Sequence, residues 1–334
     1  MKRFLALLLA MIMFGGCVAA PVSDTSLEGS SSSLEESSVS AESSSSSNAS
    51  TSDGEAFTFT DALNRTVTVQ NPQKVAALMG SFAEVWLLAG GELVAVTEDA
   101  WDERPFDLPE DVTDLGSMRA PDLERMIALG TDFVLLSSKV AEHVDLKDTL
   151  EGAGMTIAYF SVETFEDYLA MLETLTGITG RADLYEKNGQ SVREQVDAAI
   201  ARSEGEEAPS VLYIRAYSSG VKAKGKDTLA GAMMDDLGCR NIADSDASLL
   251  DDLSLEKILL EDPDYIFVTT MGASAEKAME SVEELLTSNP AWNSLTAVQN
   301  DHYYVLPKEL FHYKPNANWG DSYDYLADIL YPEA

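Results

Sequence analysis

Short apolar runs that alternate with segments of helical periodicity constrain the fold of this chain more than any other feature. Strands are predicted at Val75–Met79, Leu93–Thr97, Phe133–Leu136 and Thr156–Phe160, and helices near Phe82–Ala89, Leu123–Leu129, Val140–Gly152 and Phe165–Thr176. Parallel strands need long crossover connections, which are usually helices, so this alternation predicts a parallel sheet covered by helices. Ahead of it, Phe57–Asp61 and Arg65–Val69 alternate apolar and polar residues and predict a β-hairpin.

A second series of strands follows one long helical segment. Residues 181–202 contain no proline and one glycine, and their apolar residues recur at helical spacing, which predicts a single long helix. Further strands are then predicted at Val211–Arg215, Tyr265–Thr269 and Tyr303–Leu306. We therefore expect an α/β protein with three folded parts: an N-terminal lobe over residues 57–180, a connecting helix over residues 181–203 and a C-terminal lobe over residues 208–334.

An internal repeat indicates that the two lobes are related. Leu123–Val134 matches Leu255–Ile266 without a gap, at a constant offset of 132 residues, and such a repeat is typical of duplicated half-domains. It places Glu124 and Glu256 in the first turn of equivalent helices. Two interpretations of these glutamates are open: an acidic residue there stabilises the helix terminus by about 0.3–1 kcal/mol, whereas two matched carboxylates could also bind a partner that carries arginines.

The first 56 residues predict the cellular compartment. Lys2-Arg3 and the eleven-residue apolar run Phe4–Phe14 are typical of a signal peptide over residues 1–16, because a membrane span needs about 20 residues. Phe14-Gly15-Gly16-Cys17 resembles the bacterial lipobox, although an ordinary cleavage site with an incidental Cys17 is the alternative. Residues 17–56 are rich in serine and predict a disordered tether. We expect a lipoprotein that carries its lipid (palmitate) on Cys17, at the extracytoplasmic face of the cell membrane.

The chain is strongly acidic, so the places where its few basic residues gather are informative. With 57 acidic and 22 basic side chains the net charge is −35 at pH 7, which excludes nucleic acid as a partner. The stretch 208–226 lacks acidic residues and holds four basic ones, Arg215, Lys222, Lys224 and Lys226. Arg215 closes a strand, and the carboxyl ends of parallel strands face the ligand crevice. By the same reasoning Arg119 and Lys139 lie at the rim of the first lobe, whereas the three lysines could instead be solvated on a surface hairpin.

Aromatic residues accompany these cations. The acid-free stretch Leu310–Asn316 contains Phe311, His312 and Tyr313, and Trp101 and Tyr217 add further flat apolar surface. Cations and aromatic rings that face a cleft suit a large anionic ligand, because arginine forks and cation–π contacts can both be used. We therefore expect a cleft that is spared of acidic residues and binds a large anionic ligand.

Several motifs together resemble one known family. They are Ser81-Phe82-Ala83-Glu84, Leu115-Gly116 ahead of Pro121-Asp122-Leu123-Glu124, Leu237-Gly238-Cys239-Arg240-Asn241-Ile242-Ala243, and Leu253-Ser254-Leu255-Glu256. In order and spacing they resemble the substrate-binding lipoproteins of ABC importers for ferric siderophores, haem and cobalamin. The resemblance implies two Rossmann-like lobes joined by a rigid helix, with the ligand in the cleft between them. It also implies that Glu124 and Glu256 pair with arginines of the membrane permease.

Among the ligands of that family, a ferric catecholate or hydroxycarboxylate siderophore is anionic and fits the cleft best. Other functions are not excluded by the sequence. Haem fits the same cleft, with His312, Tyr313 or Met118 as axial ligand, and cobalamin would use the aromatic residues more than the charge. A surface adhesin would share the anchor and the tether. We expect a monomer with no resident cofactor and no enzymatic activity, because no nucleophile or phosphate-loop motif is complete. A site for a bare metal ion is not expected either, since His143 and His302 are not at ligand spacing from His312.

Overall fold

The computed structural model describes residues 56–102, 106–251, 253–272 and 274–332 of the 334-residue chain. The predicted signal peptide, the lipidation site Cys17 and all but the last residue of the predicted tether lie outside these ranges. Within them, no helix combines the length and the apolar character that a membrane crossing requires.

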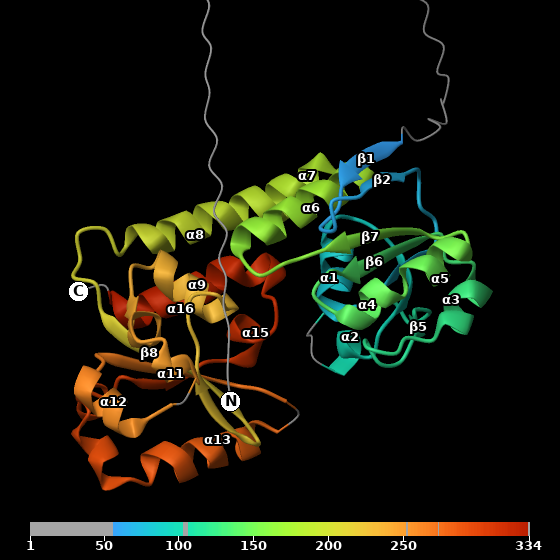
Figure 1. The fold of residues 1–334 in the computed structure, drawn as a ribbon. Coiled ribbons are helices and arrows are strands. Elements are labelled where there is room, and N and C mark those ends of the chain that lie inside the picture. The colour runs from blue at the N-terminus through green and yellow to red at the C-terminus, as the bar shows by residue number, and fades with distance from the viewer. Residues whose placement is uncertain (1–55, 103–105, 252, 273, 333–334) are drawn as a thin grey trace, which may run out of the picture. The chain divides into compact units, whose positions relative to one another are not determined.

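The N-terminal lobe, drawn in blue to green in Figure 1, is built on a five-stranded parallel sheet. Its strand order is β5-β4-β3-β6-β7. Its strands are β3 (Val75–Ala77), β4 (Leu93–Val96), β5 (Thr113–Asp114), β6 (Phe133–Ser137) and β7 (Thr156–Phe160). Its helices are α1 (Gly80–Leu88), α2 (Asp99–Asp102), α3 (Leu123–Leu129), α4 (Ala141–Asp145), α5 (Lys147–Gly152) and α6 (Phe165–Thr179). Every residue of the interior strand β6 is buried, as expected for a sheet covered on both faces. The predicted strands are confirmed, and the helix predicted over residues 140–152 is two shorter helices.

The predicted hairpin precedes this sheet. It consists of β1 (Phe57–Thr60) and β2 (Thr66–Val69), which pair antiparallel. Its turn places Asn64 at φ = 59°, a left-handed conformation that asparagine tolerates better than most residues. The Asp61 carboxylate closes the turn, because it accepts the backbone N–H groups of Leu63 and Arg65 at 3.0 Å each.

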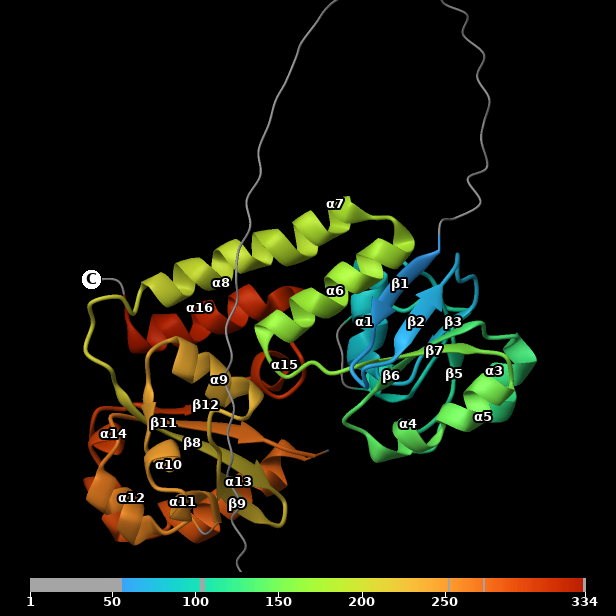
Figure 2. The same ribbon diagram turned by 45° about the horizontal axis from the view of Figure 1, so that its top comes forward.

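Residues 182–201 are helical without interruption, in three consecutive segments. They are α7 (Ala182–Tyr185), the π-helical segment η1 (Glu186–Gln190) and α8 (Ser191–Ala201). Figure 2 shows α8 beside the last helix, α16 (Trp319–Leu330). The close approach needs Gly320, because a Cβ atom there would lie 2.2 Å from the Gln195 side chain. The helical character predicted for this segment is confirmed, and its role as a rigid connector stays a prediction.

The C-terminal lobe repeats the parallel design. Its sheet has the order β10-β8-β11-β12, with β9 antiparallel on β8. The strands are β8 (Ser210–Tyr217), β9 (Gly220–Ala223), β10 (Arg240–Asn241), β11 (Tyr265–Thr270) and β12 (Tyr303–Val305). The helices other than α16 are α9 (Leu229–Asp236), α10 (Ile242–Ser245), α11 (Ser248–Asp251), α12 (Leu255–Glu261), α13 (Ala275–Val282), α14 (Thr296–Gln299) and α15 (Lys308–Phe311), with the short segments η2 (Glu283–Thr287), η3 (Pro290–Ser294) and η4 (Asn316–Asn318). The structure is thus a mixed α/β fold with two lobes, as predicted.

The last part of the chain packs back onto the first lobe. Trp319 of α16 lies 5.7 Å from the ring of Phe165 in α6, and both are buried in one continuous apolar core. Asn316 is fully buried and donates to the Ser81 carbonyl at 3.0 Å and to the Glu84 carboxylate at 2.7 Å. These contacts fix the segment after β12 against α1, and this segment carries several of the candidate ligand residues.

Candidate ligand-binding cleft

A hollow of about 240 Å³ joins residues from the carboxyl ends of the second sheet to one residue of the first lobe. Its lining residues are Glu163, Arg215, Asp227, Thr228, Leu229, His312 and Lys314. Arg215 lies near the end of β8, His312 and Lys314 follow α15, and Glu163 precedes α6. The structure therefore brings together two residues that the sequence singled out, Arg215 and His312, although about 100 residues separate them in the chain.

Arg215 offers unused hydrogen-bond capacity to this cleft. The side chain is half-buried, and its Nη2 lies 3.4 Å from the Tyr213 hydroxyl, to which it donates. Its Nε is buried and has no hydrogen-bond partner in the described part of the chain, where no carboxylate pairs with the guanidinium either. A buried guanidinium N–H that is left unsatisfied favours an anionic ligand which accepts from it.

His312 is a half-buried imidazole close to several cationic side chains. Burial, reinforced by the nearby charges of Arg215, Lys308 and Lys314, lowers the pKa of His312 to about 4. The imidazole is therefore neutral at pH 7 and can accept or donate a hydrogen bond without adding charge. Its ring lies 4.9 Å from that of Tyr313, so an aromatic pair lies next to the cationic side chains.

We expect the stability of the fold to decrease below pH 6.5 because of His312. The pKa of His312 is lower in the folded state than in the unfolded chain, so the unfolded chain binds the proton first as the pH falls. The contribution of His312 to the stability of the folded state is therefore complete above pH 6.5 and is lost as the pH falls toward 4. Between pH 7 and pH 5.5 the loss should be about 1 kcal/mol in the free energy of unfolding. Urea denaturation of the wild-type chain and of the His312→Gln variant at both pH values measures it. An equal pH dependence in the two proteins would contradict this assignment.

The expectation of a cleft without acidic residues is wrong. Glu163 and Asp227 both line it. The Glu163 carboxylate accepts from the Lys139 ammonium at 2.7 Å, so one predicted ligand cation of the first lobe is already paired. An acidic residue at this place reduces the affinity for an anionic ligand, because the two would repel each other.

Most of the other predicted ligand residues lie outside the lining. Arg119 is 69 % exposed and pairs with Glu142 at 2.9 Å. Lys222 is exposed on β9, opposite Arg215 in the ladder, and Lys226 lies 3.6 Å from the Asp235 carboxylate. The remaining predicted residues, Tyr217, Lys224 and Tyr313, are half-buried, and Trp101 is 43 % exposed beyond the end of β4. Ligand contacts by these side chains stay predictions.

The prediction that Phe311 lies at the surface of the cleft is wrong. The sequence predicts it to be part of the flat apolar surface of the cleft, but its side chain is fully buried in the main core and packs 5.5 Å from the Tyr325 ring of α16. Phe311 ends α15, and the next residue, His312, turns toward the cleft instead. Consecutive residues at a helix end point about 100° apart, so only one of the two could face the ligand.

His143 has a structural role that the sequence does not indicate. It is fully buried, its Nδ1 accepts from the Ser137 N–H at 3.0 Å, and this leaves Nε2 to donate to the Met118 carbonyl at 2.9 Å. Burial lowers the pKa of His143, which favours this neutral form. His143 thus fixes the loop that contains Met118 to the end of β6. Met118 is one of the predicted alternative haem ligands. In the described ranges, no group of three or more His, Cys, Asp or Glu side chains could hold a metal ion.

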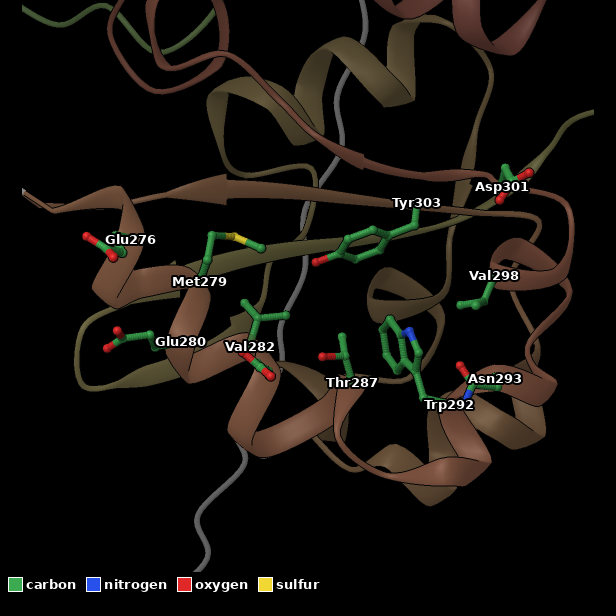
Figure 3. A pocket seen from close by; sticks show the side chains of 11 residues that line it. Glu276, Met279, Glu280, Val282, Thr287, Trp292, Asn293, Val298, Asp301 and Tyr303 are labelled. Atoms are coloured by element: carbon green, nitrogen blue, oxygen red, sulfur yellow. The ribbon is translucent and has the colours of Figure 1, made fainter.

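A larger hollow, of about 960 Å³, lies elsewhere in the C-terminal lobe (Figure 3). It extends between α13 and the residues that lead into β12, with Trp292 and Tyr303 as aromatic lining and Glu276, Glu280 and Asp301 as acidic lining. It reaches the amino end of β12, whereas ligands of open α/β sheets bind at the carboxyl ends. Its volume is larger, but its place and its negative charge do not suit an anionic ligand, so the smaller cleft is the better candidate.

Glu124 and Glu256 occupy matching, exposed positions on α3 and α12. Neither forms an ion pair with any residue that the structure describes. The bond that caps α3 is made by Asp122, whose carboxylate accepts the Arg125 N–H at 3.0 Å. Helix capping by hydrogen bonding therefore does not account for Glu124, and both carboxylates are available to a partner.

Comparison with known proteins identifies the family. The model of a family described as periplasmic binding proteins matches residues 75–310, well over half of the chain. The chain belongs to this family of periplasmic binding proteins. The "Iron-uptake system-binding protein" of Bacillus subtilis (strain 168) is 26 % identical over 207 residues, which are 60 % of this chain and 63 % of that relative. The match thus spans less than two thirds of the relative's length.

Solved structures of other proteins share the fold. Staphylococcus aureus SirA, complexed with staphyloferrin B, has a TM-score of 0.63 and 20 % identity, with 82 % of this chain and 97 % of that chain covered. BauB, bound to a complex of two acinetobactin molecules and ferric iron, has a TM-score of 0.66 and 18 % identity, with 84 % and 100 % covered. S. aureus IsdE, complexed with haem, has a TM-score of 0.62 and 15 % identity, with 77 % and 98 % covered. At these identities the similarity establishes the fold alone.

Besides Thr228 and Leu229, the sequence did not identify the three other charged lining residues of this cleft, Glu163, Asp227 and Lys314. Lys314 lies in the acid-free stretch that was noticed for its aromatic residues, so its charge was an available signal. Glu163 and Asp227 carried no signal, since the chain is rich in acidic residues throughout. Their place in the cleft follows only from the packing of the two lobes.

Proposed function

We propose that this protein captures an anionic iron chelate, above all a ferric siderophore, and delivers it to the permease of an ABC importer. The observation that carries the proposal is Arg215, a half-buried guanidinium with an unsatisfied Nε in a cleft that also holds Lys314 and the neutral His312. Catecholate and hydroxycarboxylate siderophores present anionic oxygens to such donors. Membership in a family of solute-binding proteins supports the same role.

The proposal includes the predicted location. A lipid on Cys17 would hold the protein at the extracytoplasmic face of the cell membrane, and the serine-rich tether of about 40 residues has a root-mean-square reach of roughly 35 Å. The binding protein would act there as a monomer and without a resident cofactor. Glu124 and Glu256 would dock on arginines of the permease.

A fluorescence titration tests the bound ligand. The purified protein is titrated with ferric staphyloferrin B, ferric acinetobactin, haemin and cyanocobalamin, and quenching of tryptophan emission is followed. We expect at least one ferric siderophore to bind with a Kd below about 1 μM, and the iron-free siderophore to bind more weakly. Binding of haemin alone, with a shifted Soret band, would assign the cleft to haem; binding of cyanocobalamin alone would assign it to cobalamin. Absence of binding by all four would favour an adhesin or another structural lipoprotein.

Replacing Glu163 by glutamine should strengthen the binding of an anionic siderophore. The change removes a negative charge from the cleft that holds Arg215 and Lys314, so we expect a Kd about three- to tenfold lower, with the gain reduced at high salt. Glu166→Gln is the matched control, because Glu166 is in the first turn of α6, three residues after Glu163, but pairs with Arg193 and does not line the cleft. Equal affinities for the Glu163 variant and the wild type would show that Glu163 does not act on the ligand.

A further inference from the structure

The helices that carry Glu124 and Glu256 also expose large apolar side chains. Five such side chains are exposed in the described part of the molecule, namely Trp101, Ile127, Leu260, Leu285 and Val305. Two of the five are on the repeat-related helices: Ile127 of α3 is 55 % exposed and Leu260 of α12 is 83 % exposed. An exposed leucine on a helix that has other apolar residues to bury is a candidate for an interaction surface.

The apolar residue and the glutamate share one face on each helix. Ile127 follows Glu124 by three residues and Leu260 follows Glu256 by four, so at 100° per residue each pair lies within about 60° around the helix axis. The opposite face of each helix packs into its lobe, through Met126 in α3 and through Ile258 in α12. Each helix therefore presents one carboxylate and one aliphatic side chain side by side.

The charges around these two positions are arranged alike. The neighbouring cations are paired with other carboxylates of their own lobe, Arg125 with Asp122 at 3.1 Å and Lys257 with Asp246 at 3.5 Å. No described residue neutralises Glu124 or Glu256. The surface is thus negative and apolar at once, and its partner must provide basic groups next to apolar pockets.

We propose that Ile127 and Leu260 are apolar anchors for the permease, each inserted beside the basic group that binds the adjacent glutamate. This inference rests on the proposed function. An ion pair on a solvated surface contributes little, whereas burying a neighbouring aliphatic group excludes water and strengthens the pair. Because the arrangement occurs once on each lobe, the permease surface presents the complementary site twice. A second copy of this chain does not suit the surface, because two chains of net charge −35 repel each other.

Uptake measurements with three variants of the full chain test the proposal. They are Ile127→Ser with Leu260→Ser, Glu124→Gln with Glu256→Gln, and Leu285→Ser, the last a matched control since Leu285 is 53 % exposed on η2. Each replaces the chromosomal copy in the producing bacterium, and uptake is measured with the 55Fe complex of staphyloferrin B, acinetobactin or haem, whichever binds the purified protein. We expect the apolar double variant to take up iron at least about tenfold more slowly, to keep the wild-type Kd for the ligand, and to recover when it is overproduced.

The outcomes separate this inference from the proposed function. Wild-type uptake by the apolar variant, together with loss in the glutamate variant, would overturn the anchors and leave the docking glutamates in place. An equal loss in the Leu285 variant would also overturn the anchors, because the effect would then not be specific to α3 and α12. Wild-type uptake by both double variants would overturn the anchors and the docking glutamates together. No binding of any of the three iron complexes would overturn the proposed function itself.

Discussion

Replacement of both Glu124 and Glu256 by alanine is expected to reduce transport to the background level and to leave ligand affinity unchanged. The two carboxylates are exposed, have no ion-pair partner among the described residues and are on neither side of the candidate cleft. Removing one member of a charge pair that becomes buried in an interface costs about 2–5 kcal/mol, so two losses weaken docking by roughly a thousandfold or more. Uptake of the 55Fe chelate by cells and a titration of the purified variant measure the two quantities separately.

The control for this experiment is a pair of exposed carboxylates elsewhere. Glu280 and Glu284 are also exposed and free of ion pairs in the described ranges, and their replacement by alanine removes the same net charge. Uptake should stay at the wild-type level in that variant. If the Glu124 and Glu256 variant transports normally, the docking role is excluded; if it loses ligand affinity as well, its defect lies in the cleft or in folding.

Replacement of Arg215 by methionine is expected to cost the protein most of its ligand affinity. The guanidinium has a buried, unsatisfied Nε and lines the cleft together with His312 and Lys314. Losing charged hydrogen bonds to an anionic ligand costs about 2–3 kcal/mol, which raises Kd roughly 30- to 150-fold. Arg215→Lys should recover only part of the loss, because lysine keeps the charge but not the planar fork. The fluorescence titration provides the measurement.

Lys222→Met is the matched control for Arg215. Lys222 lies opposite Arg215 in the β8–β9 ladder and has the same charge, but it is exposed and does not line the cleft. Its replacement should change Kd by less than about twofold, since an exposed charge is screened by water and salt. A similar loss in both variants would mean that the anion responds to the general field of β8 and β9, which would contradict a direct contact with Arg215.

Much of the fold was predictable because its signals are local. Each long strand of the two parallel sheets is buried on both faces, so it reads as a short apolar run between turn residues, and β6 and β11 are the clearest cases. Of the strands that were missed, β5 and β10 have two residues each, too few for any periodicity to show. The four-residue strand β9 was also missed and had been considered only as part of a possible surface hairpin. The helix predicted over residues 181–202 was also recognisable locally, although its π-helical part was not.

The candidate site was predictable only in part. Arg215 and His312 were identified because a basic and an aromatic residue at the ends of predicted strands point to the crevice of such folds, and they do line one cleft. Phe311 was assigned to the same surface because composition does not reveal which side of a short helix faces the core. Lys139 was expected to meet a ligand, but its partner in the structure is Glu163, a residue that follows the next strand.

The sequence by itself determined the order of the longer strands and helices, the internal repeat that matches Glu124 with Glu256, and the membership of the chain in a family of solute-binding proteins. These follow from periodicity and from motif order, which depend on neighbouring residues. Only the tertiary structure decided which side chains converge on the cleft, that Phe311 is buried while His312 is not, and that Ile127 and Leu260 are left uncovered. The physical reason is that burial and electrostatic field at a side chain depend on contacts between segments far apart in the chain, and these contacts arise only when the lobes pack.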